Sequence, residues 1–129
     1  MIDHTGLQVS DFARSKAFYV AALAPIGYGV LLELPRAVVG TDVVGFGETA
    51  TGKPDFWVAQ GEPNKPALHI AFRVESRALV DAFYQAAMAP GGRDNGPPGK
   101  RPHYHENYYG AFVLDPDGHN IEAVCHTPA

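Results

Sequence analysis

Hydrophobic and polar residues alternate along two short segments of the chain, which predicts β-strands at Ile2–Val9 and Leu68–Val74. Each predicted strand is followed by a stretch in which apolar residues recur at helical spacing, as Leu79, Ala82, Phe83 and Ala86 do. We therefore expect two strand–helix units. The predicted helices span Phe12–Ala24 and Arg77–Ala89 and follow the N-cap residues Asp11 and Ser76.

The remainder of each half has the pattern of short strands separated by turns. The predicted strands are Gly29–Leu34, Ala37–Phe46, Asp55–Gln60, Tyr108–Leu114 and Asn120–His126. Asp115, Pro116, Asp117 and Gly118 have the composition of a type I turn between the last two strands. The Gly/Pro-rich stretch Gly91–Pro102 is predicted to be a loop, long enough to serve as a lid.

The two halves of the chain are copies of one unit. At an offset of 65 residues, 11 of the 25 positions in Asp3–Gly27 are identical to those in Leu68–Gly92. A half of about 64 residues is near the size at which a single hydrophobic core becomes marginal. We therefore predict one α+β domain of two βαβββ modules, residues 1–64 and 65–129, that pair within a chain or across a dimer.

Composition narrows the function classes. The 129 residues include ten Lys and Arg and fourteen Asp and Glu, for a net charge of −4, and no basic cluster indicates nucleic-acid binding. No apolar run approaches the length of a membrane span, and no signal peptide is visible at the start. A single cysteine, Cys125, cannot form an internal disulfide. These features favour a soluble cytoplasmic protein.

Candidate metal ligands share one face of the predicted sheet. Strand alternation places Leu7 and Val9 toward the helix and His4 on the opposite face. The same alternation places His69 of the second half on the face opposite the helix, and it directs Glu122 of the last strand to that face as well. Two imidazoles and one carboxylate can hold a divalent metal and leave positions open for substrate. The alternative is a metal-free pocket lined by these residues.

Trp57 occupies the place in the first half that Glu122 has in the second. An indole has only an N–H donor and cannot ligate a cation. A metal site would therefore have three protein ligands, and Trp57 would form a wall of the pocket or fill the core of the sheet.

These motifs resemble the glyoxalase/bleomycin resistance protein/extradiol dioxygenase group, the vicinal oxygen chelate superfamily. The resemblance covers essentially the whole chain and is carried by Ile2–His4, Ser15–Tyr19 and Asp115–Glu122. It implies a cup-shaped half-barrel, usually in a dimer, with metal ligands at His4, His69 and Glu122. Glyoxalase I enzymes use four protein ligands, so Trp57 departs from their pattern. The ligand set resembles those of extradiol dioxygenases and fosfomycin-modifying thiol transferases, but Phe112 stands where the extradiol signature has Tyr.

The leading hypothesis is a glyoxalase-like metal-dependent enzyme for a small substrate that chelates Fe²⁺, Mn²⁺, Zn²⁺ or Ni²⁺ through adjacent oxygens. Lyase or isomerase, dioxygenase and thiol-transferase chemistry all remain open. The candidate proton carriers beside Glu122 are His105 and Tyr109, and the candidate pocket residues are Gln8, Trp57, Arg73 and Phe112. A second hypothesis is a metal-free protein that sequesters a ligand, as the bleomycin-resistance branch does. A third is a regulatory protein with a vestigial cup.

Overall fold

The computed structural model describes residues 1–129 and shows two consecutive modules, each with a strand, a long helix and three further strands, which confirms the predicted α+β fold. The first module contains β1 (Thr5–Val9), α1 (Phe12–Leu23), the 3₁₀ turn η1 (Ala24–Ile26), β2 (Tyr28–Leu34), α2 (Arg36–Val39), β3 (Val43–Glu48) and β4 (Pro54–Gln60). The second contains β5 (His69–Arg73), α3 (Arg77–Met88), β6 (Arg93–Lys100), β7 (Tyr109–Leu114) and β8 (Asn120–Cys125).

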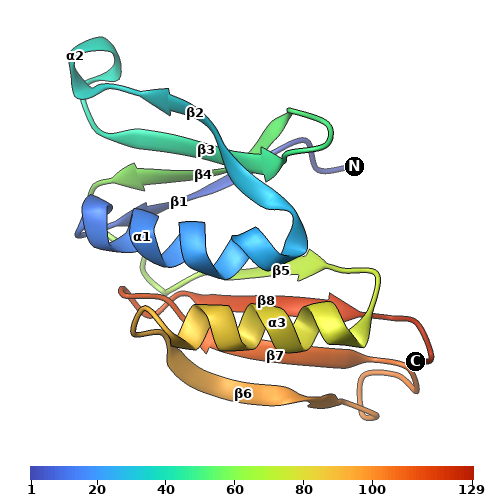
Figure 1. Cartoon of the computed structure of the whole chain (residues 1–129). Helices are drawn as coiled ribbons and strands as arrows, with labels where there is room; N and C mark the ends of the chain where they lie inside the picture. Colours follow the sequence, from blue (N-terminus) through green and yellow to red (C-terminus); the bar gives the residue numbers. More distant parts are fainter.

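Each module forms its own four-stranded sheet, and neither sheet closes into a barrel. The strand orders are β1-β4-β3-β2 and β5-β8-β7-β6. In both sheets the first strand pairs in parallel with the last, and the other neighbours are antiparallel. The first strand of each module is therefore a sheet edge, and these two edges run between the sheets in Figure 1.

Local sequence sets the ends of the two long helices. The side chains of Asp11 and Ser76 accept hydrogen bonds from the backbone N–H groups of Arg14 and Leu79, as expected of N-cap residues. In the first module the chain leaves η1 through Gly27, whose φ of 86° favours glycine.

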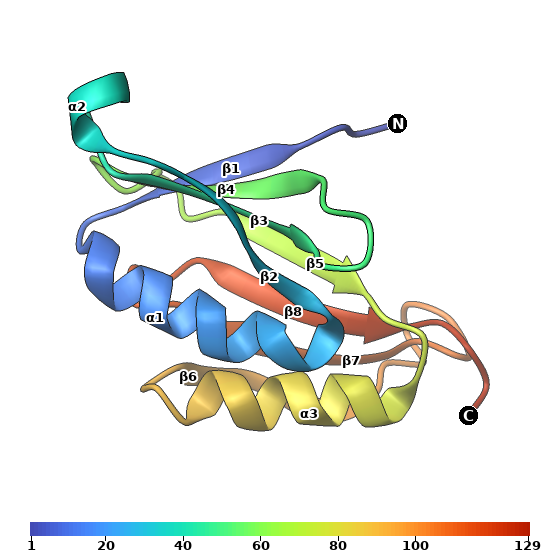
Figure 2. The same cartoon turned by 45° about the horizontal axis from the view of Figure 1, so that its top comes forward.

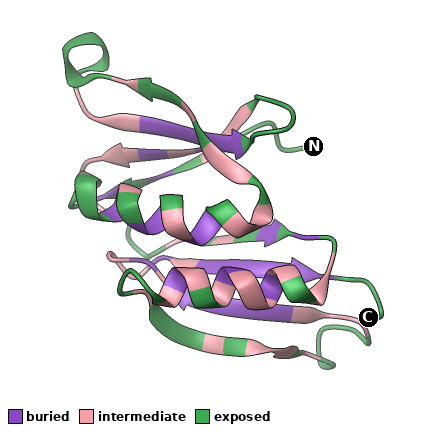
Figure 3. Cartoon of the chain, viewed as in Figure 1, coloured by how far each residue is buried: buried purple, intermediate pink, exposed green.

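The helices α1 and α3 lie side by side on one side of the two sheets (Figure 2). The hydrophobic core continues from one module to the other, because the ring of Phe72 in β5 lies 5.4 Å from Phe56 and 5.3 Å from Tyr28. Figure 3 shows the buried residues concentrated in the middle strands, whereas α2 and much of β6 are exposed. No helix is long and apolar enough to span a membrane.

Buried polar groups join the modules at the β7–β8 turn. The hydroxyl of Tyr19 donates to Asp115 Oδ2 at 2.6 Å, and both residues are fully buried. His119, also fully buried, lies with Nε2 3.1 Å from the carbonyl oxygen of Gln8, while its Nδ1 accepts from the N–H of Leu68 at 3.0 Å. These contacts join the end of β1 to the beginning of β5 and β8.

Two predictions about secondary structure were wrong. The segment predicted as one strand, Ala37–Phe46, contains the end of α2 and most of β3, because the helical turn after Pro35 ends at Gly40 with φ of 86°. The predicted lid loop Gly91–Pro102 contains the edge strand β6. Its prolines are compatible with an edge position, and its irregular pairing with β7 absorbs them.

Candidate functional site

Glu122 is a carboxylate buried in the second sheet. Its neighbours along β8, Ile121 and Ala123, are fully buried toward the helix side, so alternation directs Glu122 to the opposite face. Its residue is only 1% exposed. A buried carboxylate is costly unless polar or charged groups compensate it. The partners of Glu122 therefore define the candidate site.

Two side chains contact the carboxylate of Glu122. His69 Nε2 lies 2.8 Å from Oε1, and the hydroxyl of Tyr108 donates to Oε2. Burial, followed by the hydrogen bond to Glu122, raises the pKa of Tyr108 well above its ordinary value. Tyr108 therefore stays neutral at physiological pH, and its hydroxyl holds the carboxylate of Glu122 by donating a hydrogen bond. A Cβ at Gly110 would lie 3.2 Å from Oε2, so glycine leaves room for this arrangement.

His69 and Glu122 provide an imidazole nitrogen and a carboxylate side by side, which are donor types that first-row divalent metals accept. The side chain of His69 is 52% exposed, so this pair is open to a ligand from outside. Two protein donors fit such a metal but do not complete a three-ligand set. The chain contains no group of three or more His, Cys, Asp or Glu side chains placed to hold one ion.

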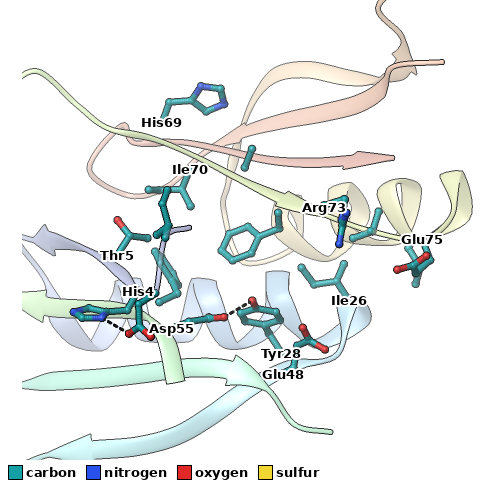
Figure 4. A pocket seen from close by; sticks show the side chains of 17 residues that line it. His4, Thr5, Ile26, Tyr28, Glu48, Asp55, His69, Ile70, Arg73 and Glu75 are labelled. Carbon is teal, nitrogen blue, oxygen red and sulfur yellow. Dashed lines mark hydrogen bonds and ion pairs between the residues drawn. The ribbon is translucent and has the colours of Figure 1, made fainter. Parts of the chain in front are cut away.

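His4 lies apart from the other two predicted ligands. It precedes β1, its side chain is 61% exposed, and its Nδ1 lies 2.7 Å from Asp3 Oδ1. Figure 4 shows His4 and His69 on different sides of the space between the modules, with the ring of His69 directed away from His4. One chain therefore brings His69 and Glu122 together but leaves His4 out of contact with them, although His4 and His69 both line a cleft between the modules.

The two predicted proton carriers occupy different surroundings. His105 Nε2 lies 2.9 Å from His126 Nδ1, and the His105 ring is 5.4 Å from that of Tyr108. Tyr109 points to the helix side, where its hydroxyl donates to Asp81 of α3 at 2.8 Å. The hydroxyl of Tyr109 is thus on the face opposite Glu122.

The four predicted pocket residues lie in four different places. Phe112 lies beside the site, with its ring 6.1 Å from that of His69. Trp57 is on the first sheet and pairs with Gly6 on one side and Gly45 on the other. Gln8 belongs to the joint between modules, where its N–H donates to Asn64, and Arg73 lines a cleft between the modules.

Tyr108 and Arg101 complete the surroundings of the site, and sequence analysis did not select them. Strand alternation contained the signal for Tyr108, since it has the same parity as Phe112, whose neighbour across the strands is Glu122. Arg101 lay in the predicted loop. In the structure its guanidinium lies 5.4 Å from the centre of the Phe112 ring and donates to the carbonyl of Pro97 at 2.7 Å.

The sequence profile of the Glyoxalase/Bleomycin resistance protein/Dioxygenase superfamily matches residues 1–123. No curated protein matches this chain. A glyoxalase/bleomycin resistance protein from Albidiferax ferrireducens is 26% identical, with a TM-score of 0.75 over 97% of this chain and 98% of that one.

Two enzymes also share the fold at lower identity. A glyoxalase I mutant from Zea mays is 21% identical, with a TM-score of 0.73 over 97% of this chain and 46% of that one. A mutant of the fosfomycin resistance protein FosX from Listeria monocytogenes, solved with Mn(II) and a dihydroxypropylphosphonic acid, is 18% identical. Its TM-score is 0.67 over 95% of this chain and 87% of that one.

Proposed function

Because the chain belongs to the glyoxalase/bleomycin resistance protein/dioxygenase superfamily, we propose that it is a metal-dependent enzyme for a small substrate that chelates the metal through adjacent oxygens. The observation that carries this proposal is the buried carboxylate of Glu122, held 2.8 Å from the half-exposed imidazole of His69. The proposed chemistry is of the lyase or isomerase, dioxygenase or thiol-transferase type. The proposed location is the cytoplasm.

In this proposal the metal is Fe²⁺, Mn²⁺, Zn²⁺ or Ni²⁺, and its ligands are His69, Glu122 and His4. Because His4 and His69 are both exposed and lie apart in one chain, the third ligand is His4 of the partner subunit in a homodimer. The pairing of modules between chains would thus complete the site.

The bound metal would act as a Lewis acid for the oxygens of the substrate. Tyr108 orients Glu122 through its hydrogen bond, and Phe112 limits the space beside His69. The proposed proton carrier is His105, whose imidazole lies beyond Tyr108 at the exposed edge of the site. Trp57 would form the opposite wall when the sheets of two chains come together.

Trp57 favours a second candidate function, the metal-free sequestration of a flat ligand. Its indole lies against Gly45 of the neighbouring strand, where a Cβ would lie 2.8 Å from the ring. Bare backbone beside an aromatic side chain leaves room for stacking. A sequestering protein would bind its ligand equally well with and without a chelator, which separates the two candidates.

Metal content tests the proposed function. The protein purified without a chelator or histidine tag is expected to carry about one divalent metal ion per chain by elemental mass spectrometry, and EDTA is expected to lower its melting temperature. His69→Ala should lose the metal, whereas His103→Ala, an exposed histidine outside the site, should retain it. Iron would favour oxygenation, and manganese, nickel or zinc would favour transfer or isomerisation. No metal after anaerobic reconstitution would refute the proposal.

Mixed dimers test the contribution of His4. His4→Ala and Glu122→Gln are each expected to lose metal binding as homodimers. After the two variants are unfolded together and refolded, half of the sites in a mixed dimer would combine intact His4 from one chain with intact His69 and Glu122 from the other. Recovery of metal in the mixture supports a site between chains, and no recovery contradicts it.

A further inference from the structure

A cleft of about 660 Å³ separates the two modules on the helix side of β5. It extends from the residues before β1 to the residues after β5, as Figure 4 shows. This volume is within the range of small-molecule sites. The cleft adjoins the Glu122 site, because His69 contacts Glu122 and also lines the cleft. Its floor is formed by residues that face the helices and the core.

The floor of the cleft is apolar and aromatic. Phe56, Phe72 and Tyr28 lie in edge-to-face contact, with ring centres 5.3 and 5.4 Å apart. Ile70 and Leu79 add aliphatic surface beside them. Phe56 and Phe72 are at most 8% exposed, so the accessible part of this floor is formed by the half-buried side chains of Tyr28, Ile70 and Leu79, which can accept an apolar group.

The rim of the cleft carries an excess of negative charge. Four carboxylates line it, and the only Lys or Arg among its lining residues is Arg73. Lys53 lies 3.2 Å from Asp3 and compensates that carboxylate. Glu48 and Glu75 have no ion-pair partner within 4.0 Å.

The fourth carboxylate, Asp55, lies closest to the aromatic floor. It accepts a hydrogen bond from the hydroxyl of Tyr28 at 3.1 Å, as the dashed line in Figure 4 shows. Burial and the charge of Asp55 raise the pKa of Tyr28 to about 12. Tyr28 is therefore a neutral hydrogen-bond donor to Asp55 and brings no positive charge to the cleft.

From this combination we infer that the cleft binds an organic cation, an ammonium group carried on an apolar body. The body lies on the aromatic floor, and the ammonium group faces Asp55, Glu48 and Glu75. A negatively charged cleft concentrates positive ligands from solution.

Three probes with one apolar body and different head groups test the inference. Binding of 4-phenylbutylamine, 4-phenyl-1-butanol and 4-phenylbutyrate to the full chain is measured by titration in ¹H–¹⁵N spectra. The amine is expected to bind about tenfold more tightly than the alcohol, and the carboxylate should bind least. The amides that shift should be those of Tyr28, Ile70, Phe72 and Leu79.

Charge-neutralising variants locate the head group. Glu48→Gln and Glu75→Gln are each expected to weaken binding of the amine about threefold and to leave the affinity for the alcohol unchanged. Glu62→Gln removes the same charge from an exposed position outside the cleft and should have no effect. Equal binding of all three probes, tighter binding of the carboxylate, or shifts outside the cleft would overturn the inference. The absence of amine binding, as expected if a second copy of the chain fills the cleft, would also overturn it.

Discussion

Trp57 and Glu122 occupy equivalent places in two sheets of the same topology, and their surroundings differ. Trp57 pairs with Gly6 and Gly45, and its indole lies on the bare backbone of Gly45. Glu122 pairs with Ala71 and Phe112 and is held by His69 and Tyr108. One sheet presents a flat aromatic surface, and the other presents a buried carboxylate with hydrogen-bonding partners.

This difference shows how a repeated module can retain its scaffold while its open face changes. The helix-facing residues Val9 and Val74 are identical at the 65-residue offset and buried in both modules, as the packing of each sheet against helices requires. The opposite face is not constrained by that packing. It can therefore carry an aromatic side chain in one module and a candidate ligand in the other.

The largest difference between the modules in the free energy of unfolding is expected from substitutions in the turns that connect their last two strands. Asp115 accepts hydrogen bonds from the Tyr19 hydroxyl and from the N–H groups of Asp117 and His119. Asp115→Ala would leave three donors without this partner and should lower the free energy of unfolding by about 3 kcal/mol or more. Denaturant titration measures this change.

The matched variant in the first module is Thr51→Ala. Thr51 is exposed, and its hydroxyl reaches only the carbonyl of Glu48 at 3.4 Å. The free energy of unfolding should change by no more than about 0.5 kcal/mol. Similar losses for the two variants would contradict the asymmetry of the turns.

A smaller effect is expected from Gly45→Ala on the first sheet. The new Cβ would lie 2.8 Å from the Trp57 ring, which must move. We expect a loss of about 1–2 kcal/mol and a change in the emission of Trp57, the single tryptophan in the chain. In Gly29→Ala the Cβ would meet only Thr49, so the emission should stay that of the wild type. Unchanged emission in Gly45→Ala would show that the indole does not lie on the glycine surface.

The smallest effect concerns the tyrosine–carboxylate pairs, Tyr28–Asp55 in the first module and Tyr108–Glu122 in the second. Burial and Asp55 raise the pKa of Tyr28 to about 12 in the folded chain, above its ordinary value of 10.0. The stability that this shift provides is complete below pH 10 and is lost as the pH rises toward 12. Absorbance at 295 nm should show a titration near pH 12 that Tyr28→Phe removes. Asp55→Asn should move it to lower pH, and an unchanged midpoint would contradict the role of Asp55.

Much of the fold was predictable because its signals are local. The repeat, the apolar spacing of the helices and the N-cap residues Asp11 and Ser76 indicated both modules. The strand β6 was not predictable from its composition, because Pro97 and Pro98 suggest a loop and only pairing with β7 makes this segment a strand. The short helix α2 depends on one turn after Pro35, which is too short to give a periodic signal.

The candidate site was predictable only in part. Alternation along β5 and β8 placed His69 and Glu122 on one face, and their contact agrees with that parity. Parity does not determine how two modules are oriented, so it could not indicate that His4 lies apart from them. The position of Tyr109 on the helix side follows from the same rule that places Tyr108 beside Glu122. The role of His105 stays a prediction.

The central claim is that the second sheet, and not the first, supplies the carboxylate of a metal site. Titration of metal-depleted protein with Mn²⁺ tests it most directly when Glu122→Gln is compared with Trp57→Phe. Glu122→Gln preserves the size of the side chain, Trp57→Phe retains an aromatic ring, and neither substitution removes a backbone group of the strand pairing. We expect Glu122→Gln to weaken Mn²⁺ binding by at least about 100-fold, whereas Trp57→Phe should bind Mn²⁺ as the wild type does. Equal affinities in the two variants would contradict it.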